Sequence, residues 1–230
     1  MTLTAPSNLR VYIGYDSRED IAYRVARESL LRHSSIPLEI IPIVQSELRA
    51  SGLYARENDP LSSTEFSFTR FLVPHLAGYN GWAVFMDCDF LARGDIATIT
   101  DYADGALACL VVKHDYRPPE TVKMDGKAQH VYHRKNWSSF MFINCGHEQV
   151  KRLTPKVVNE QTGMYLHQFE WLRDDMIGSL PIAFNYLEGW HTKADCPNPI
   201  LVHFTRGGPW FKDWMDVEYG KEWLNASRNV

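Results

Sequence analysis

An apolar run of five residues, Trp82-Ala-Val-Phe-Met86, ends directly in the triplet Asp87-Cys-Asp89. A continuous run of this length is typical of a strand that is buried on both faces of a parallel sheet. Carboxylates at the carboxyl end of such a strand lie where ligands usually bind in open α/β sheets. We therefore expect a layered α/β fold with an acidic site at one edge of its sheet.

Further segments alternate between strand and helix patterns, which favours the α/β class. The strand patterns cover residues 9–14, 38–44, 106–112, 139–144 and 200–204, and the helix patterns cover residues 21–33, 64–76, 154–160 and 164–172. Ser17 and Asp20 predict a capping box at the start of the first helix. Pro42 predicts an edge position for the second strand, and Pro74 predicts a distorted helix end.

Composition predicts one folded domain over residues 1–230. With 45% hydrophobic residues the chain can bury a large core, and its formal net charge of -4 disfavours a nucleic-acid partner. The four cysteines are spread without a CxxC pair, so we expect reduced thiols and a cytoplasmic protein. We expect neither a secretory signal nor a transmembrane segment, because no apolar run approaches the roughly 20 residues of a spanning helix.

The two aspartates of the triplet suit a divalent metal ion. Carboxylate oxygens favour Mg²⁺ or Mn²⁺, and these ions keep coordination positions open for phosphate oxygens. A departing nucleoside diphosphate accumulates negative charge that such an ion neutralises. A phosphatase of the haloacid dehalogenase type also carries DxD after an apolar strand, but its motif continues to Thr or Val and lies near the chain start. Here Phe90 and Leu91 follow Asp89, so that alternative fits poorly.

A second group of polar residues ends the strand pattern at residues 200–204. His203 lies in this strand pattern, and Arg206, Gly207 and Gly208 follow it. A histidine can bind the metal, an arginine can pair with phosphate, and glycines let the backbone approach a diphosphate closely. Together with the acidic triplet, this group indicates a metal site with three protein ligands.

These motifs resemble the family 8 glycosyltransferases, which are retaining enzymes with a GT-A fold. The shared pieces are, in the family's order, VYIGYD, TRFLVPHL, VFMDCDFLARGDI, SFMFINC and HFTRGGPW. They extend over residues 9–212, which is nearly the whole chain. The resemblance implies a single Rossmann-like GT-A domain with a mixed, mostly parallel central sheet flanked by helices. It also implies a UDP-sugar donor and Mn²⁺ as cofactor, with Mg²⁺ as an alternative.

The resemblance assigns the donor side of the site residue by residue. Asp87, Asp89 and His203 are expected to hold the metal against the diphosphate, and Tyr15 and Asp16 to lie at the base and ribose. The other residues expected to bind the donor are Arg70, Cys88, Ser138, Ser139, Arg206, Gly207 and Gly208.

The chain departs from the family pattern at two places. Trp137-Ser138-Ser139 stands where the family usually has Asn-Ala-Gly before its central strand. The closing motif is one residue shorter than usual and has no lysine before Pro209. Arg206 or Lys212 is expected to make the phosphate contact instead.

The family's short acidic motif near the reacting carbon best matches Arg173-Asp174-Asp175. We expect Asp174 and Asp175 to be the catalytic pair, with Asp174 nearest the anomeric carbon. Asn185 and Trp190 are expected on the acceptor side.

Acceptor specificity is expected to reside in residues 114–135 and 161–172. The first of these segments is long and lacks periodicity, and such loops are often functional.

The expected function is transfer of a hexose, with retention, from a UDP-sugar to a hydroxyl of a saccharide, lipid-linked or small-molecule acceptor. Two alternatives stay open. A sugar nucleotidyltransferase usually has a glycine-rich basic loop after its first strand, where this chain has only Gly14 before Tyr15 and Asp16. A catalytically silent nucleotide- or carbohydrate-binding module is the other. The donor sugar, the acceptor and the oligomeric state do not follow from the sequence.

Overall fold

The computed structural model of the protein describes residues 8–57, 62–115 and 133–230. It contains a central six-stranded sheet with the order β2-β1-β3-β6-β5-β7 and a smaller sheet with the order β4-β9-β8. The strands are β1 (Leu9–Tyr15), β2 (Leu38–Val44), β3 (Trp82–Met86), β4 (Phe90–Ala92), β5 (Cys109–Val111), β6 (Phe140–Asn144), β7 (Ile177–Ser179), β8 (Tyr186–Leu187) and β9 (Leu201–His203). The helices are α1 (Asp20–His33), α2 (Gln45–Ala50), α3 (Val73–Leu76), α4 (Pro155–Glu160), α5 (Gly163–His167) and α6 (Gly220–Ser227).

The central sheet is mixed and mostly parallel, as predicted. β1 pairs in parallel with β2 and β3, and β5 pairs in parallel with β7. Only β6 runs the other way, because it pairs antiparallel with both β3 and β5. The carboxyl ends of β1, β3 and β5 therefore meet at one edge of the sheet, and the residues that lead into β6 lie at that edge as well. We call it the carboxyl edge.

The apolar run Trp82–Met86 forms β3, which lies in the middle of the sheet. Ala83, Val84, Phe85 and Met86 of β3 are completely buried, with β1 on one side and β6 on the other. A strand with covered faces needs no polar alternation, which explains its continuous hydrophobic sequence. The chain leaves the core at Asp87, so the acidic triplet lies at the carboxyl edge.

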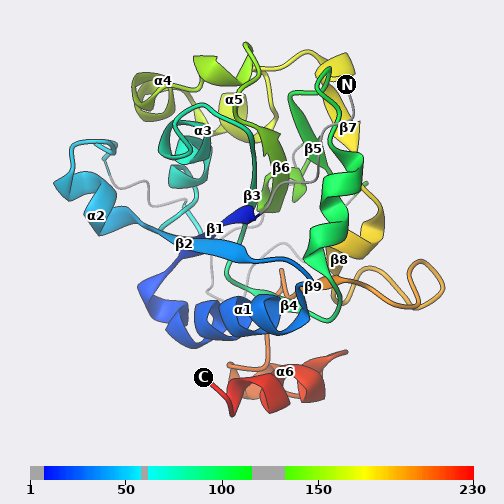
Figure 1. Cartoon of the computed structure of the whole chain (residues 1–230). Helices are drawn as coiled ribbons and strands as arrows, with labels where there is room; N and C mark the ends of the chain where they lie inside the picture. Colours follow the sequence, from blue (N-terminus) through cyan, green and yellow to red (C-terminus); the bar gives the residue numbers. More distant parts are fainter. Residues whose placement is uncertain (1–7, 58–61, 116–132) are drawn as a thin grey trace.

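Helices cover both faces of the central sheet (Figure 1). α1 and α6 lie together on one side, and α3, α4 and α5 lie on the other. α1 buries Ala22, Val25, Ala26, Ser29 and Leu30, which form one stripe at helical spacing. This stripe also contacts the small sheet, because the Ser29 hydroxyl accepts a hydrogen bond of 3.0 Å from the backbone N–H of Ala92 in β4.

Most predicted strands are confirmed. The first and second strands match β1 and β2, and β2 lies at the sheet edge, where Pro42 costs no hydrogen bond to a further strand. The predicted strands at 106–112, 139–144 and 200–204 are shorter in the structure, as β5, β6 and β9. The last of them belongs to the small sheet.

The predicted capping box is wrong. A 3₁₀ turn (Ser17–Glu19) precedes α1, and the Asp16 side chain caps that turn by accepting from the Arg18 N–H. α1 itself begins at Asp20 without a side-chain cap. Ser17 instead donates a hydrogen bond of 2.6 Å to the Glu65 carboxylate, so a long-range contact replaces the local one.

The predicted helix at 64–76 is also corrected. A 3₁₀ turn (Thr69–Leu72) is followed by the single α-helical turn α3, and Pro74 lies in the first turn of α3 instead of distorting a helix end. Proline fits there because the first N–H groups of a helix have no partner within the helix.

The helical pattern at 154–160 is confirmed by α4, whereas α5 ends at His167, earlier than the predicted 172. Phe169 adopts a left-handed conformation (φ 56°), which is incompatible with continuing the helix. Most of segment 114–135 lies outside the described residues. Among the helices of the described residues, none is long and apolar enough to cross a membrane.

Gly14 of β1 provides a test of the packing beside the carboxyl edge. A Cβ atom at this position would lie 2.4 Å from ring atoms of the buried Phe66. We expect Gly14→Ala to lower the free energy of unfolding by about 1–3 kcal/mol through overpacking. Gly105→Ala is the matched control, since a Cβ there meets nothing within 4 Å. Urea unfolding measures both, and equal stabilities of the two variants would contradict the packing.

Candidate functional site

Three ligand-type side chains converge at the carboxyl edge. Asp87 follows β3, Asp89 precedes β4, and His203 ends β9. One ligand atom of each lies within 4.8 Å of the others, and His203 Nε2 is 3.2 Å from Asp89 Oδ1. The antiparallel register of β4 and β9 pairs Phe90 with His203 and so brings the distant segments together. We call Asp87, Asp89 and His203 the metal-site cluster.

The orientation of His203 follows from a chain of hydrogen bonds. The Asn185 amide donates to Ser139 Oγ at 3.0 Å, and Ser139 Oγ in turn donates to the carbonyl of Asn136. The amide oxygen of Asn185 is thereby left to accept from His203 Nδ1, which lies 3.0 Å away. In a neutral imidazole with the proton on Nδ1, Nε2 carries a lone pair.

This arrangement fits a divalent cation. In the neutral form, the His203 Nε2 lone pair and an Asp89 carboxylate oxygen face each other, and two acceptors at 3.2 Å need a proton or a cation between them. Two carboxylates and one imidazole, the latter held by a hydrogen-bonded partner, form a typical metal-ligand set.

Charge in the metal-site cluster is only partly balanced. Burial raises the pKa of Asp87 to about 6, although the Arg70 guanidinium opposes this shift. Burial acts on Asp89 in the same direction, but the neighbouring His203 and Arg70 hold the pKa of Asp89 below its ordinary value. The two carboxylates of the cluster are therefore held close to the core, with less positive charge beside them than full neutralisation requires.

Arg70 neutralises part of that charge. Its Nη1 lies 2.8 Å from Asp87 Oδ1 and donates to the Ser138 carbonyl at 2.8 Å. The guanidinium is buried beside the rings of Phe66 and Phe85. Its expected contact with the donor stays a prediction, because Arg70 is engaged with the protein itself.

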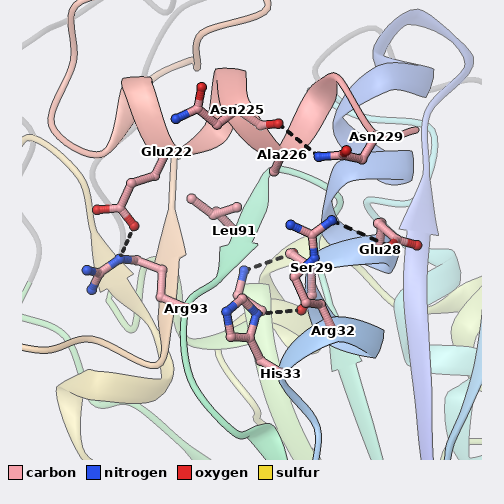
Figure 2. A pocket seen from close by; sticks show the side chains of 11 residues that line it. Glu28, Ser29, Arg32, His33, Leu91, Arg93, Glu222, Asn225, Ala226 and Asn229 are labelled. Carbon is pink, nitrogen blue, oxygen red and sulfur yellow. Dashed lines mark hydrogen bonds and ion pairs between the residues drawn. The ribbon is translucent and has the colours of Figure 1, made fainter.

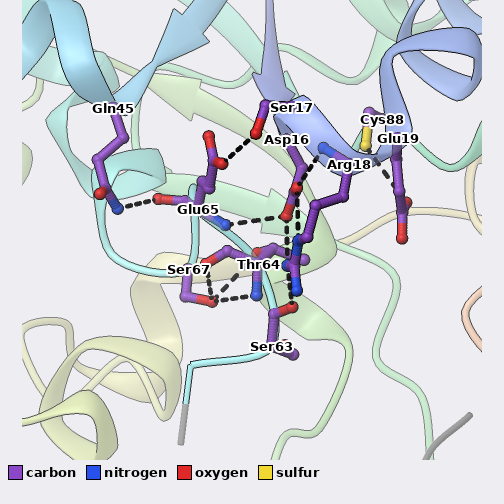
Figure 3. Close-up of polar contacts among 10 residues, drawn as sticks. All are labelled: Asp16, Ser17, Arg18, Glu19, Gln45, Ser63, Thr64, Glu65, Ser67 and Cys88. Atoms are coloured by element: carbon purple, nitrogen blue, oxygen red, sulfur yellow. Dashed lines mark hydrogen bonds and ion pairs between the residues drawn. The ribbon is translucent and has the colours of Figure 1, made fainter. Parts of the chain in front are cut away.

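The residues expected at the base and ribose also make contacts within the protein. Asp16 is completely buried and accepts hydrogen bonds from Arg18 and from the N–H of Glu65, so it ties the end of β1 to a distant loop (Figure 3). Although burial opposes it, these bonds hold the pKa of Asp16 below its ordinary value. Tyr15 donates to Asp20 and packs edge-on against Tyr23.

Glu19 is a residue of the site that the sequence did not single out (Figure 3). Its carboxylate accepts a weak hydrogen bond from the buried Cys88 thiol at 3.8 Å. Burial raises the pKa of Glu19 to about 8, and the negative charges of Asp89 and Asp16 add to the shift. The only sequence signal was its place in the polar turn after the first strand, which leads to the carboxyl edge.

The segment after β9 packs closely against itself. A Cβ at Gly208 would meet the ring of Trp210 at 2.0 Å, so this glycine has a packing reason that is independent of any ligand. The Arg206 guanidinium lies 5.2 Å from the centre of the Trp214 ring and close to Gly189. The phosphate contacts expected of Arg206, Gly207 and Gly208 remain predictions.

The two acids expected at the reacting carbon lie apart from the metal-site cluster. Asp174 and Asp175 precede β7, at its amino end, whereas Asp87 follows the carboxyl end of β3. Their side chains are 84% and 63% exposed, and they pair with Arg134 and with Arg173. Their catalytic role stays a prediction that the geometry does not support.

The structure places the two residues expected on the acceptor side differently from each other. Asn185 has no exposed surface and hydrogen-bonds His203, so its expected place on the acceptor side stays a prediction that the geometry does not support. Trp190 is 38% exposed in the loop after β8. The Ser138 hydroxyl contacts His167 of α5, and the Ser139 hydroxyl accepts from the Asn185 amide, so both serines are bonded within the protein and their expected contacts with the donor stay predictions.

A cavity of about 320 Å³ lies elsewhere, between α1, β4 and α6 (Figure 2). It is lined by Arg32, Arg93, Glu28 and Glu222, together with Asn225 of α6 and Asn229 just after that helix. Arg93 pairs with Glu222 at 2.6 Å. None of the residues of the metal-site cluster lines this cavity.

Comparisons with known proteins support the fold. The chain is 55% identical over 219 residues to Protein CDI of Arabidopsis thaliana, an alignment that covers 94% of this chain and 85% of that protein. No family model matches the sequence.

Three similar solved structures are glycosyltransferases. The bifunctional glycosyltransferase WbbM matches with a TM-score of 0.69 and 13% identity, and GlyE of Streptococcus pneumoniae with 0.63 and 15%. The alignments cover 100% and 96% of this chain but only 51% and 60% of those chains. The galactosyltransferase LgtC, solved with donor and acceptor sugar analogues, matches with 0.61 and 11%, over 96% of both chains. The predicted GT-A fold is thereby confirmed.

Asn185 provides a test of the metal-site cluster. We expect Asn185→Ala to weaken Mn²⁺ binding about 10–100-fold, because the amide holds the His203 ring in place. Isothermal titration with Mn²⁺ measures the effect. Asn144→Ala is the control, since that amide bonds the Leu107 carbonyl at the other end of β6. Equal Mn²⁺ affinity in both variants would show that His203 is not a ligand oriented by Asn185.

Glu19 provides a test by pH. Because the pKa of Glu19 is higher in the folded protein than in the unfolded chain, the folded state binds more protons between pH values of about 4.5 and 8. Stability that depends on Glu19 therefore falls as the pH rises through this window. We expect metal-free Glu19→Gln to gain stability relative to the wild type as the pH rises, in urea unfolding. Glu160→Gln, at an exposed position, is the control. If the free energies of unfolding of Glu19→Gln and the wild type differed by the same amount at every pH, the burial of this carboxylate would be contradicted.

Proposed function

The chain belongs to the family of Protein CDI of Arabidopsis thaliana and has a GT-A fold, and from this premise we propose that it is a retaining glycosyltransferase of the family 8 type. Its proposed reaction moves a hexose from a UDP-sugar to a hydroxyl acceptor. One observation carries the proposal, namely the convergence of Asp87, Asp89 and His203 at the carboxyl edge of the sheet. Ligands usually bind at this edge in α/β folds.

Asp87, Asp89 and His203 are the proposed ligands of Mn²⁺, with Mg²⁺ as an alternative. The bound ion neutralises the negative charge that develops on the departing diphosphate. Arg70 holds Asp87 and Asn185 orients His203, so the ligands are positioned before any substrate arrives. Such preorganisation avoids the cost of arranging them during the reaction.

The proposed transfer breaks the bond between the anomeric carbon and the diphosphate oxygen and forms a bond to the acceptor oxygen. The transition state resembles an oxocarbenium ion, as in glycoside hydrolysis. With retention, the leaving phosphate oxygen takes the proton of the acceptor hydroxyl, so no strong base from the protein is required. The proposal therefore does not rest on Asp174 or Asp175, whose side chains are exposed.

The proposed partners are a nucleotide sugar and an acceptor that is a saccharide, a lipid-linked sugar or a small molecule. We propose that the reaction takes place in the cytoplasm. The four cysteines support this, because all are free thiols and three of them are buried.

Nucleotide binding provides the test of this proposal. We expect UDP to bind in the presence of Mn²⁺, and Asp89→Ala to lose this binding by about 100-fold or more, because the variant loses one of three ligands. Asp213→Ala, at an exposed position, is the control. Isothermal titration of UDP with and without Mn²⁺ measures the affinity, and release of UDP from a panel of UDP-sugars measures turnover. A UDP affinity that is the same with and without Mn²⁺ would refute the proposal, as would the absence of UDP binding. Binding without any UDP release would identify a silent module instead.

A further inference from the structure

One buried histidine beside the site has no hydrogen-bond partner on its ring among the residues that the structure describes. His114 follows β5 at the carboxyl edge, and its side chain is buried. Its backbone is well held, because its N–H donates to the Val112 carbonyl and its carbonyl accepts from the Trp137 indole. Neither Nδ1 nor Nε2 has a hydrogen-bond partner within the described parts of the chain.

This state is costly for a protein interior. A buried donor or acceptor without a partner has lost its hydrogen bonds to water and gained none in return, and a neutral imidazole has one of each. Burial lowers the pKa of His114 to about 2, and the nearby His191 and His203 contribute to the shift. The ring is thus neutral and presents one N–H donor and one lone pair.

A second histidine lies beside it. The ring centres of His114 and His191 are 5.3 Å apart, with an angle of 34° between the planes. His191 Nδ1 accepts from the N–H of Leu187, so the proton of the neutral ring is on Nε2, which makes Nε2 a donor. We call His114 and His191 the histidine pair.

The histidine pair lies close to the metal-site cluster. β8 runs parallel to β9, and Leu187 is paired with His203, so the loop that carries His191 leaves the sheet beside the cluster. β5 ends at the carboxyl edge, as β3 does. The pair therefore combines two donors and one acceptor next to the proposed position of the diphosphate.

We propose that the histidine pair recognises hydroxyl groups of the sugar, with His114 as a specificity-determining residue whose ring gains a hydrogen bond to a sugar hydroxyl. This inference rests on the proposed function and extends it to the sugar. A hydroxyl either donates to the His114 lone pair or accepts from its N–H, since the two ring nitrogens point in different directions. A site that hydrogen-bonds a hydroxyl rejects an analogue that lacks it, because the buried polar groups are then left unpaired.

The test replaces His114 by an apolar side chain. We expect His114→Leu to reduce kcat/KM for UDP release from UDP-hexoses by tenfold or more, while UDP affinity with Mn²⁺ stays within twofold. The melting temperature should not fall, since the ring makes no hydrogen bond with a described residue that the variant would lose. His33→Leu, at an exposed position in α1, is the matched control.

Deoxy donors separate recognition from a merely structural role. Wild-type protein should discriminate against at least one deoxy analogue of its UDP-hexose, and His114→Leu should remove that discrimination. If instead the variant hydrolyses UDP-hexoses normally but transfers poorly to a panel of methyl glycosides, the recognised hydroxyls belong to the acceptor. Wild-type kinetics in both assays, or unchanged discrimination against every deoxy donor together with normal transfer, would overturn the inference.

A measurement on the wild type covers the case in which His114→Leu does not fold. In ¹⁵N-histidine-labelled protein with Mg²⁺, the ring nitrogens of His114 should shift on addition of a UDP-hexose, or of a methyl glycoside, but not of UDP alone. No shift with any sugar would overturn the inference. A wild-type protein that neither binds UDP nor releases it from UDP-sugars would instead refute the proposed function.

Discussion

The antiparallel pairing of β4 with β9 is the contact on which the candidate site depends. It places His203 opposite Phe90, whose ring stacks on the imidazole. The two ring centres are 4.2 Å apart, and the angle between the ring planes is 14°. The N–H of Phe204 donates to the Asp89 carbonyl at 2.9 Å and fixes the register beside the second aspartate. A slip by one residue would turn His203 to the opposite face of the small sheet. The metal-site cluster is therefore produced by a strand pairing between distant parts of the chain, and its geometry depends on that pairing.

Polar groups with incomplete partners gather at the carboxyl edge. The imidazole and carboxylate of the metal-site cluster face each other, Glu19 has only a weak bond from the Cys88 thiol, and the His114 ring has no hydrogen bond among the described residues. Interiors normally satisfy such groups, so a concentration of them at one edge indicates a place that is completed by a ligand. Arg70 and Asn185, which position the ligands of the metal-site cluster, are themselves hydrogen-bonded within the protein. The groups with incomplete partners lower the stability of the ligand-free protein, and a bound ligand is proposed to supply the hydrogen bonds that they lack.

Local patterns predicted the parts of the structure that depend on local chemistry. The strand Trp82–Met86 was predicted to the residue, because a fully covered strand needs an unbroken apolar run, and the acids at its end followed from its direction. The capping box failed because Ser17 bonds the distant Glu65. The hydrogen bond between His203 and Asn185 was not predicted, because sequence spacing does not reveal a contact between side chains of separate segments. His114 was named only as the first residue of the specificity segment 114–135, because the lack of hydrogen-bond partners on its ring, among the described residues, is a property that only the folded surroundings define.

Diffraction at the manganese absorption edge, from crystals grown with UDP and Mn²⁺, tests the central claim most directly. The account predicts one anomalous peak at the carboxyl edge, in coordination contact with His203 Nε2 and with both Asp87 and Asp89, and with the UDP diphosphate on its open side. An ion bound elsewhere, with His203 still paired to Asp89, would contradict it, as would UDP bound at this edge without any ion.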